Sequence, residues 1–356
     1  MIRQQPFSKT PETTMPFKMS RRSLLAGSAA AAVTGFPNVL RAQTREIFIG
    51  GPASPGLTDV LFPLIEKKHN MKILFEGTNS LINLEKIRNN KDRPTMTVTM
   101  MDDPVLVLAQ REKLIEKLPA DITNLAQLSA DAKPNEAMWA NWCQPMCSAS
   151  HNTKSMPNGV ASYADFWDKK YRDGLILISM RITQAVAPLL AATQLATGKP
   201  LAECLKLADE GFGKLKELRP NILQVSTNAP QAQQLLETGE CSAYLAPDSR
   251  TTLFRKAAGA PIDQSYPKEG VIAMPAGVAL VANGPNKDLG ITFINELLNA
   301  ETQATVAKAF FSKPTNTATK LPEGMSFPEM VVLDWEYFAD NRNRWIERFE
   351  REVAAR

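Results

Sequence analysis

Three polar residues in the first part of the chain each follow a predicted strand. These residues and the apolar runs that precede them are Ser54 after 46–50, Asn79 after 71–75, and Asp102 after 95–101. Helical stretches separate the runs, so a largely parallel sheet with right-handed crossovers is expected. Ligands bind outside the carboxyl ends of strands in such sheets. The three residues are therefore predicted to form one wall of a small-molecule site.

A cation and an amide follow a buried strand predicted at 175–178. Arg181 and Gln184 lie where a long helix begins, and this helix should end near Gly198. A guanidinium beside the free amides of a helix start is suited to hold a carboxylate or a phosphonate, because both groups act on the same anion. The alternative is that Arg181 pairs with an acid such as Asp248 and never contacts a ligand, since ion pairs also occur in clefts.

A further acid, Asp248, lies in the loop 246–250 after another short predicted strand. Asp102 and Asp248 could together hold an amino group, because a buried ammonium needs carboxylate partners. Such a pair beside a guanidinium would favour a zwitterionic, amino-acid-like solute. The alternation of strands and helices around these loops predicts an α/β fold with two lobes and a ligand between them.

The sequence patterns of common enzyme classes are absent from the chain. It contains no Gly-x-Ser-x-Gly, His-Glu-x-x-His, Walker or dinucleotide-binding pattern, and its only histidines are His69 and His151. The cysteines lack the neighbouring Cys or His ligands that structural zinc needs, so buried free thiols or one disulfide is expected instead. They are Cys143, Cys147, Cys204 and Cys241. No enzyme activity, metal or cofactor is predicted.

Residues 1–42 are predicted to be a twin-arginine signal peptide. Arg21 and Arg22 precede a short Ala-rich apolar run, and small residues near Ala42 offer a cleavage site. A transmembrane anchor is the alternative, but it would need a longer apolar run to span the ~30 Å hydrocarbon core. The segment holds six of the 41 Lys and Arg residues and one of the 37 acids, leaving 35 basic and 36 acidic side chains. The remaining chain therefore gives no support for a nucleic-acid partner, and export to the periplasm by the twin-arginine translocase is expected.

The stretch 260–303 constrains the arrangement of everything before it. It contains Pro-Lys-Glu-Gly at 267–270, a predicted buried strand at 271–281, a turn at 283–286, and an amphipathic helix whose apolar face includes Phe293. This order of features resembles the extracellular solute-binding proteins of ABC importers, in particular the group that contains the spermidine/putrescine-binding proteins. Fainter similarity extends over nearly all of the chain that follows the predicted signal peptide.

The resemblance implies a type II periplasmic-binding-protein fold, with a ligand cleft between two lobes joined by a multi-strand hinge. The first lobe would comprise residues 43–142 and 272–311, and the second lobe residues 143–271 and 312–356. The hinge would lie near residues 142–148, 268–273 and 311–315. The partners that the resemblance implies are a small-molecule solute and the membrane permease of an ABC importer.

The positions that match a polyamine site do not have the residues such a site needs. Where the spermidine/putrescine-binding proteins have an Asp and a Glu, this chain has Arg181 and Gln184; where they have a Trp and an Asp, it has Met274 and Ala276. We therefore expect a periplasmic binding protein whose solute is anionic or zwitterionic, with Met274 beside it in the site. The alternatives are a polyamine-binding protein with a rearranged site and a twin-arginine-exported enzyme.

Overall fold

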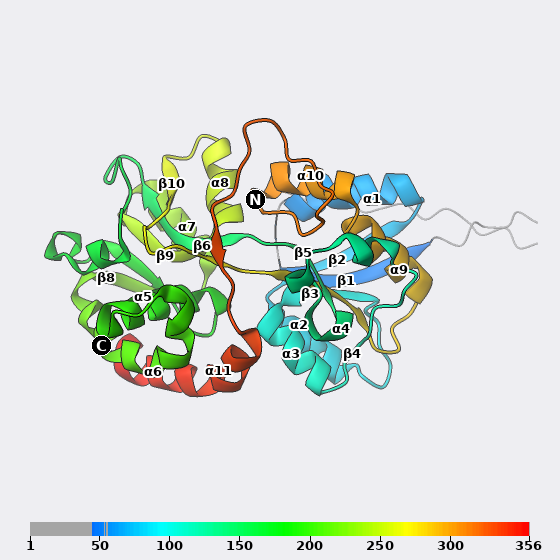
Figure 1. The fold of residues 1–356 in the computed structure, drawn as a ribbon, viewed down its shortest axis with the longest axis horizontal. Coiled ribbons are helices and arrows are strands. Elements are labelled where there is room, and N and C mark those ends of the chain that lie inside the picture. Colours follow the sequence, from blue (N-terminus) through cyan, green and yellow to red (C-terminus); the bar gives the residue numbers. More distant parts are fainter. Residues whose placement is uncertain (1–44, 53, 55, 356) are drawn as a thin grey trace, which may run out of the picture. The chain divides into compact units, whose positions relative to one another are not determined.

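The computed structural model describes residues 45–52, 54 and 56–355, and from residue 45 onward the chain forms one compact unit. The predicted signal peptide lies outside the described residues. Two β-sheets form the framework of the unit, and each sheet is flanked by its own helices (Figure 1). The sheet with β1 defines the first lobe, and the sheet with β7 defines the second.

The sheet of the first lobe has the strand order β2-β1-β3-β12-β4, and β5 also pairs with β12. β1, β2 and β3 run parallel, whereas β12 is antiparallel to all three of its partners. The strands are β1 (Glu46–Pro52), β2 (Lys72–Thr78), β3 (Val98–Asp102), β4 (Ile115–Glu116), β5 (Ala140–Cys143) and β12 (Ala276–Val281). The helices are α1 (Phe62–His69), α2 (Ser80–Asn89), α3 (Asp103–Arg111), α4 (Pro134–Ala137), α9 (Lys287–Leu297) and α10 (Ala300–Phe310).

The sheet of the second lobe has the strand order β13-β11-β6-β9-β7-β8, and β10 pairs with β6. β7 is parallel to β8 and β9, whereas β6 is antiparallel to its three neighbours. The strands are β6 (Met146–Asn152), β7 (Leu175–Ile178), β8 (Ile222–Ser226), β9 (Ala243–Asp248), β10 (Ile262–Ser265), β11 (Val271–Ala273) and β13 (Met330–Val331). The helices are α5 (Val186–Thr197), α6 (Ala208–Glu217), α7 (Ala229–Thr238), α8 (Ser249–Ala257) and α11 (Trp335–Phe349).

Both sheets are mixed, so the expectation of a largely parallel sheet is only partly right. The parallel strands are those joined through helices, as the alternating pattern predicts. The antiparallel strands β5, β6, β11 and β12 belong to the segments that pass from one sheet to the other. A segment that returns to a sheet in this way needs no crossover helix, so it can enter in the opposite direction.

The predicted continuous strand 271–281 is in fact two strands in different sheets. β11 pairs with β6 in the second lobe, and β12 pairs with β3, β4 and β5 in the first. Pro275 lies at the break, where its missing N–H prevents a ladder bond. Every residue of both strands is buried, so no alternation of polar and apolar residues marks the change of sheet.

Three chain segments lie side by side where the lobes join. The main-chain N–H of Met274 donates to the carbonyl of Pro145 at 2.9 Å, and Gln144 and Lys313 exchange main-chain hydrogen bonds of 2.8 and 3.1 Å. Residues 315–317 still bond to the first lobe, at Asn141, Ser129 and Gln127. The third crossing therefore comes later in the chain than 311–315, between Thr317 and β13.

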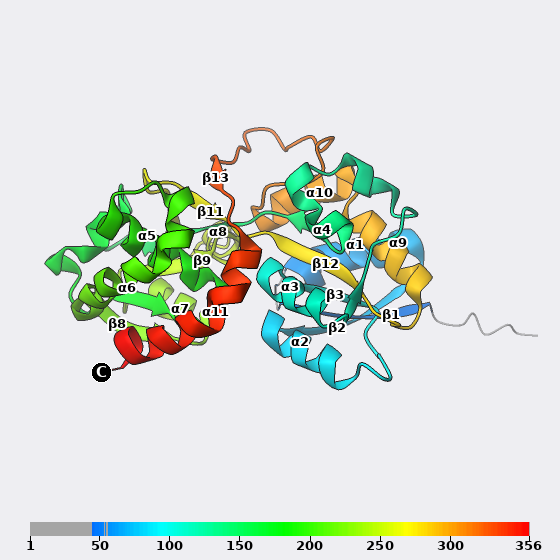
Figure 2. The same cartoon turned by 60° about the horizontal axis from the view of Figure 1, so that its bottom comes forward.

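The C-terminal helix α11 belongs to the second lobe and also reaches the first. Trp335, Phe338 and Trp345 pack into the hydrophobic core of the second lobe. On another face of the helix, Asp340 forms an ion pair with Arg111 of α3. Figure 2 shows α11 passing from the second lobe toward α3. This helix therefore links the two lobes independently of the hinge.

Local sequence signals explain several element ends. Asn79 caps α2, with its side-chain oxygen accepting from the amide of Ile82 at 2.9 Å, and Gly198 ends α5 in the left-handed conformation. Ser162 and Asp165 form a complete capping box, although the turn that they start, Tyr163–Trp167, is a 3-10 helix.

Candidate functional site

A cavity of about 770 Å³ lies between elements of the two lobes. Ser54, which follows β1, and Phe310 at the end of α10 line it from the first lobe. Ala229 at the start of α7 and Arg250 in the first turn of α8 line it from the second lobe. The cavity therefore reaches the carboxyl ends of β1, β8 and β9, where ligands bind in open α/β sheets, and it also extends along α7 and α8 to Thr238 and Arg255.

Gly56 allows two parts of the first lobe to pack closely together at this cavity. A Cβ atom at this position would lie 2.6 Å from the ring of Phe310, which is closer than two such atoms can approach. Glycine thus lets the loop after β1 pack directly against α10.

A buried ion pair forms the charged part of the cavity wall. Asp248 caps α8 by accepting from the amide of Arg250 at 2.9 Å, and the Arg250 Nε atom donates to both carboxylate oxygens at 3.0 and 2.9 Å. The side chains of Arg250 and Asp248 are only 13% and 12% exposed. Burial alone would lower the pKa of Arg250, but the charge of Asp248, its hydrogen bonds to the guanidinium and the charge of Asp102 raise it above its ordinary value. The guanidinium is therefore permanently charged.

Asp102 lies next to this pair and connects the lobes. It ends β3 in the first lobe, and the Thr183 hydroxyl of the second lobe donates to its Oδ2 atom at 3.1 Å. Burial raises the pKa of Asp102, while the bond from Thr183 and the charges of Arg250 and Arg342 oppose the rise. One carboxylate of the first lobe is thus held by a hydroxyl and two cations of the second.

The second of these cations, Arg342, comes from α11. It is 3% exposed, and its Nη2 atom donates to the carbonyl of Arg181 at 2.8 Å. Its Nε and Nη1 atoms have no hydrogen-bond partner among the described residues. Burial lowers the pKa of Arg342, and the charge of Asp102 partly offsets this effect.

Asp103, the residue that follows Asp102, is also buried. The indole N–H of Trp139 and the amide of Asn141 donate to its two carboxylate oxygens at 2.9 and 3.0 Å. Burial raises the pKa of Asp103 to about 7, and the charge of Asp102 adds to the rise. Asp103 joins the start of α3 to the strand that leads into the hinge.

One of the predicted site residues lines the cavity, and three others connect to the charged group around Arg250. Ser54 lines it, Asp248 pairs with Arg250, and Asp102 interacts with the charge of Arg250. Gln184 follows Thr183, the residue that binds Asp102, and its carbonyl accepts from the thiol of Cys147.

The other three predicted residues are not brought into this group. Arg181 is 63% exposed and forms an ion pair with Glu350, because its side chain is directed toward the C-terminal segment after α11. It does not pair with Asp248 either, since Asp248 is paired with Arg250. Asn79 is an exposed helix cap, and Met274 is buried in the hydrophobic core of the second lobe.

Sequence reasoning missed Arg342, which is buried, Arg250, which is largely buried, and a buried glutamine, Gln233, that lines the cavity with Arg250. The signal for Arg250 was present, because it lies two residues after Asp248 in the same strand-end loop. Arg342 is separated from Arg181 by 161 positions, so no local pattern relates the two.

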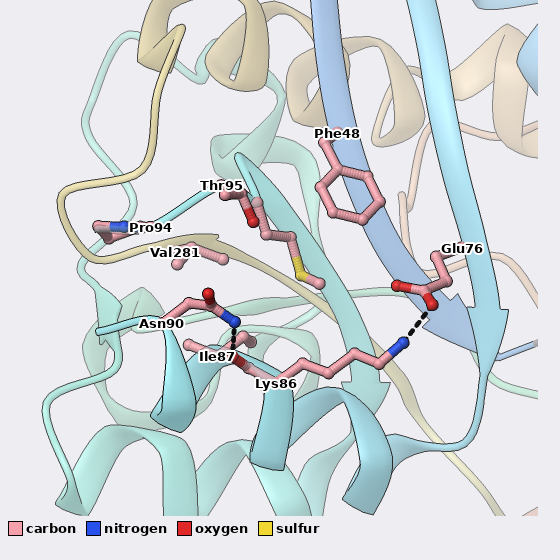
Figure 3. A pocket seen from close by; sticks show the side chains of 9 residues that line it. Phe48, Glu76, Lys86, Ile87, Asn90, Pro94, Thr95 and Val281 are labelled. Carbon is pink, nitrogen blue, oxygen red and sulfur yellow. Dashed lines mark hydrogen bonds and ion pairs between the residues drawn. The ribbon is translucent and has the colours of Figure 1, made fainter. Parts of the chain in front are cut away.

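A second cavity, of about 220 Å³, lies between α2 and the strands of the first lobe (Figure 3). Its wall is largely apolar, with Phe48 and Ile87 among its residues. Three of the polar residues drawn there bond to one another, since Lys86 pairs with Glu76 and the Asn90 amide donates to the Lys86 carbonyl at 2.8 Å. It therefore offers a polar ligand fewer free partners than the cavity between the lobes.

The cysteines and the acidic groups add no further site. All four cysteines are free and buried. Within residues 45–52, 54 and 56–355, no three His, Cys, Asp or Glu side chains are grouped so that they could hold a metal ion. None of the helices in this same part of the chain is both long and apolar enough to cross a membrane.

Comparison with known sequences supports the family resemblance. The family model described as bacterial extracellular solute-binding protein matches residues 65–329, more than half of the chain. The spermidine/putrescine-binding periplasmic protein of Escherichia coli K12 is 27% identical over 222 residues, covering 60% of this chain and 61% of that protein. The protein of the same name from Salmonella typhimurium is 27% identical over 168 residues, covering 46% of each chain. The match thus spans less than two thirds of these relatives.

Solved structures of periplasmic binding proteins share the fold. AfuA from Actinobacillus pleuropneumoniae, with fructose-6-phosphate bound, has a TM-score of 0.71 at 20% identity and covers 88% of this chain and 100% of its own. MotA from A. tumefaciens B6, in complex with glucopine, has a TM-score of 0.72 at 20% identity, with coverages of 86% and 99%. Apo ferric ion-binding protein A from Pasteurella haemolytica has a TM-score of 0.70 at 14% identity, with coverages of 86% and 98%.

These likenesses confirm the predicted type II periplasmic-binding-protein fold with two lobes. At such low identities they bear on the fold alone and not on the ligand. The family assignment rests on the family model, which spans both sheets of the structure. The chain belongs to the bacterial extracellular solute-binding protein family.

Proposed function

We propose that this protein is a periplasmic substrate-binding protein that captures a small polar solute by closure of its two lobes and delivers it to the permease of an ABC importer. Support comes from the family model and from a cavity whose walls belong to both lobes. Members of this family bind solutes and are not enzymes, so capture rather than catalysis is the expected activity. Export by the twin-arginine translocase, with cleavage near Ala42, is part of the same proposal.

The solute is anionic or zwitterionic, and the observation that carries this proposal is the buried Arg250 in the cavity wall. Its Nε atom and one Nη atom bind Asp248, which leaves N–H groups of the guanidinium for a second acceptor. The wall also contains Glu237 and Arg255, which form an ion pair with each other and so add no net charge to the cavity. Arg250 thus takes the role that the sequence suggested for Arg181.

The carboxylates of the site explain why a zwitterion remains within the proposal. Asp102 and Asp248 are balanced by Arg250 and Arg342, so the group has no large excess of either charge. An amino group could approach these acids while a carboxylate contacts Arg250. An isolated dication would instead meet Arg250 beside both acids and Arg342 beside Asp102, which is unfavourable in a buried site.

A polyamine remains the second candidate, and the relatives named for spermidine and putrescine favour it. One structural detail also does so. Ala276, which matches an Asp of those proteins, lies directly opposite Asp102 in the β3–β12 ladder. A carboxylate is therefore present next to the position where the family has one.

A thermal-shift screen separates the two candidates. Carboxylates, phosphonates and amino acids are compared with spermidine and putrescine at equal concentrations. Binding to the folded state raises the melting temperature in proportion to ln(1 + [ligand]/Kd). We expect the largest rise from a compound with an acidic group. A strong rise with either polyamine at low micromolar concentration, and none with any acid, would contradict the proposal.

A further inference from the structure

Gln233 lies on the buried face of α7 beside Ala232 and Leu236, and it is 3% exposed. Neither its Nε2 nor its Oε1 atom has a hydrogen-bond partner among the described residues. The three other buried glutamines differ in this respect, since each makes at least one side-chain hydrogen bond. They are Gln144, Gln264 and Gln303.

A buried amide without partners lowers stability, because both its donor and its acceptor lose their bonds to water on folding. An apolar side chain of the same size would avoid this loss. Gln233 lines the same cavity as Arg250. The missing partners can therefore come from a molecule that enters the cavity.

We propose that Gln233 recognises a group on the solute that both donates and accepts hydrogen bonds, and that the solute is a hydroxylated or amide-bearing organic anion. This inference rests on the proposed function, because Arg250 is taken to hold the acidic group. A hydroxyl can donate to Oε1 and accept from Nε2, and an amide can do the same with its two ends. An alkyl acid can do neither, so it leaves Gln233 unpaired and should be rejected.

Two aromatic side chains of the cavity wall are suited to contact a carbon skeleton between these polar ends. Phe310 from α10 and Phe254 from α8 both line the cavity. Aromatic side chains provide apolar contact area, while a small number of polar groups fix the orientation of the ligand. Arg250 and Gln233 are two such groups, on neighbouring helices.

The test uses matched pairs of anions with the full-length mature protein. Gluconate, malate and glycerol 3-phosphate are each compared with their deoxy counterparts, hexanoate, succinate and propyl phosphate, by isothermal calorimetry. The variants are Gln233→Met, which keeps the length of the side chain, and Gln231→Met as a control at an exposed position of the same helix.

In the parent protein we expect at least one hydroxylated anion to bind about tenfold or more tightly than its deoxy partner, the effect of one or two hydrogen bonds. Gln233→Met should lose this preference and bind the two members within about threefold. Its melting temperature without ligand should equal or exceed that of the parent, because the unpaired amide is gone. Gln231→Met should keep both the preference and the stability of the parent.

Three outcomes would overturn the inference. Equal binding of hydroxylated and deoxy anions by the parent would leave the proposed function intact but remove the role of Gln233. A preference that persists in Gln233→Met would do the same, as would a lower melting temperature of that variant, which would show that the amide serves the fold. If no anion of the panel binds and a polyamine does, the proposed function itself fails, and the inference fails with it.

Discussion

Removing the Arg250 cation should separate the structural role of the buried ion pair from its role in binding. In Arg250→Met, the carboxylate of Asp248 keeps its bond to the amide of residue 250 but loses the Nε and Nη2 donors. Asp102 loses one of its two neighbouring cations. Both acids remain buried, so the variant has uncompensated negative charge in the wall of the cavity.

The expected loss of stability follows from the burial of the pair. The two side chains are 13% and 12% exposed, so solvent screens them little. Removing one partner of such a pair costs about 3–5 kcal/mol, whereas replacing both partners is often close to neutral. The double variant Asp248→Asn/Arg250→Met removes both charges, and Asn is still a good helix cap. We expect its stability to lie within about 2 kcal/mol of the parent.

Urea denaturation and calorimetry on the same three proteins provide the assay. Stability should fall in Arg250→Met and recover in the double variant, while binding of an acidic solute should be at least about tenfold weaker in both. If binding recovers together with stability in the double variant, Arg250 serves only as the structural partner of Asp248. If Arg250→Met is as stable as the parent, the description of a buried pair is wrong.

Three further predictions concern groups outside the pair. Burial raises the pKa of Asp103 to about 7 from an ordinary value near 3.8. Between these pH values the folded protein retains a proton that the unfolded chain releases, so the stability of the fold should fall as the pH rises from about 4 to 7. Asp103→Asn should flatten that part of the pH–stability curve measured in urea, and an unchanged curve would argue against the raised pKa. The four buried thiols should react with a thiol reagent only after unfolding, and a native-state reaction of Cys143 would contradict its burial. Arg181→Met should bind the solute within about twofold of the parent, since Arg181 is exposed and paired with Glu350; a tenfold loss would restore the role first inferred from its sequence position.

Much of the fold follows from the sequence because each element is marked by local signals. α7, Ala229–Thr238, begins and ends at such signals, with Asn228 as its cap and Gly239 at its end. The 162–167 segment begins with a capping box of Ser162 and Asp165, whose spacing is visible in the sequence. The order of strands and helices then restricts the topology, because parallel strands need crossover connections.

The passage of the chain between the sheets was less predictable. Residues 271–281 are apolar throughout, and a strand buried on both faces gives no period from which a change of sheet could be inferred. Pro275 was the only local signal of a break. The third crossing, after Thr317, has no regular structure until β13, so only the hydrogen bonds to the first lobe fix its position.

The site could be predicted as a region but not as a set of contacts. The carboxyl ends of the strands are where Asp102, Asp248 and Ser54 lie, as expected. The direction of each side chain depends on the turn that follows the strand, and this turn directs Arg181 outward and Arg250 inward. No sequence pattern indicates that the amide of Gln233 is unpaired, because this depends on which side chains surround it in the folded chain.

The central claim, that the cavity holds an organic acid, is tested most directly by identifying the solute that the protein carries. The protein would be purified from the periplasm without refolding, unfolded, and the released compound identified by mass spectrometry. We predict a compound with a carboxylate, phosphonate or phosphate group, present in the parent and absent from Arg250→Met. Recovery of spermidine, putrescine or another amine without an acidic group would contradict the account.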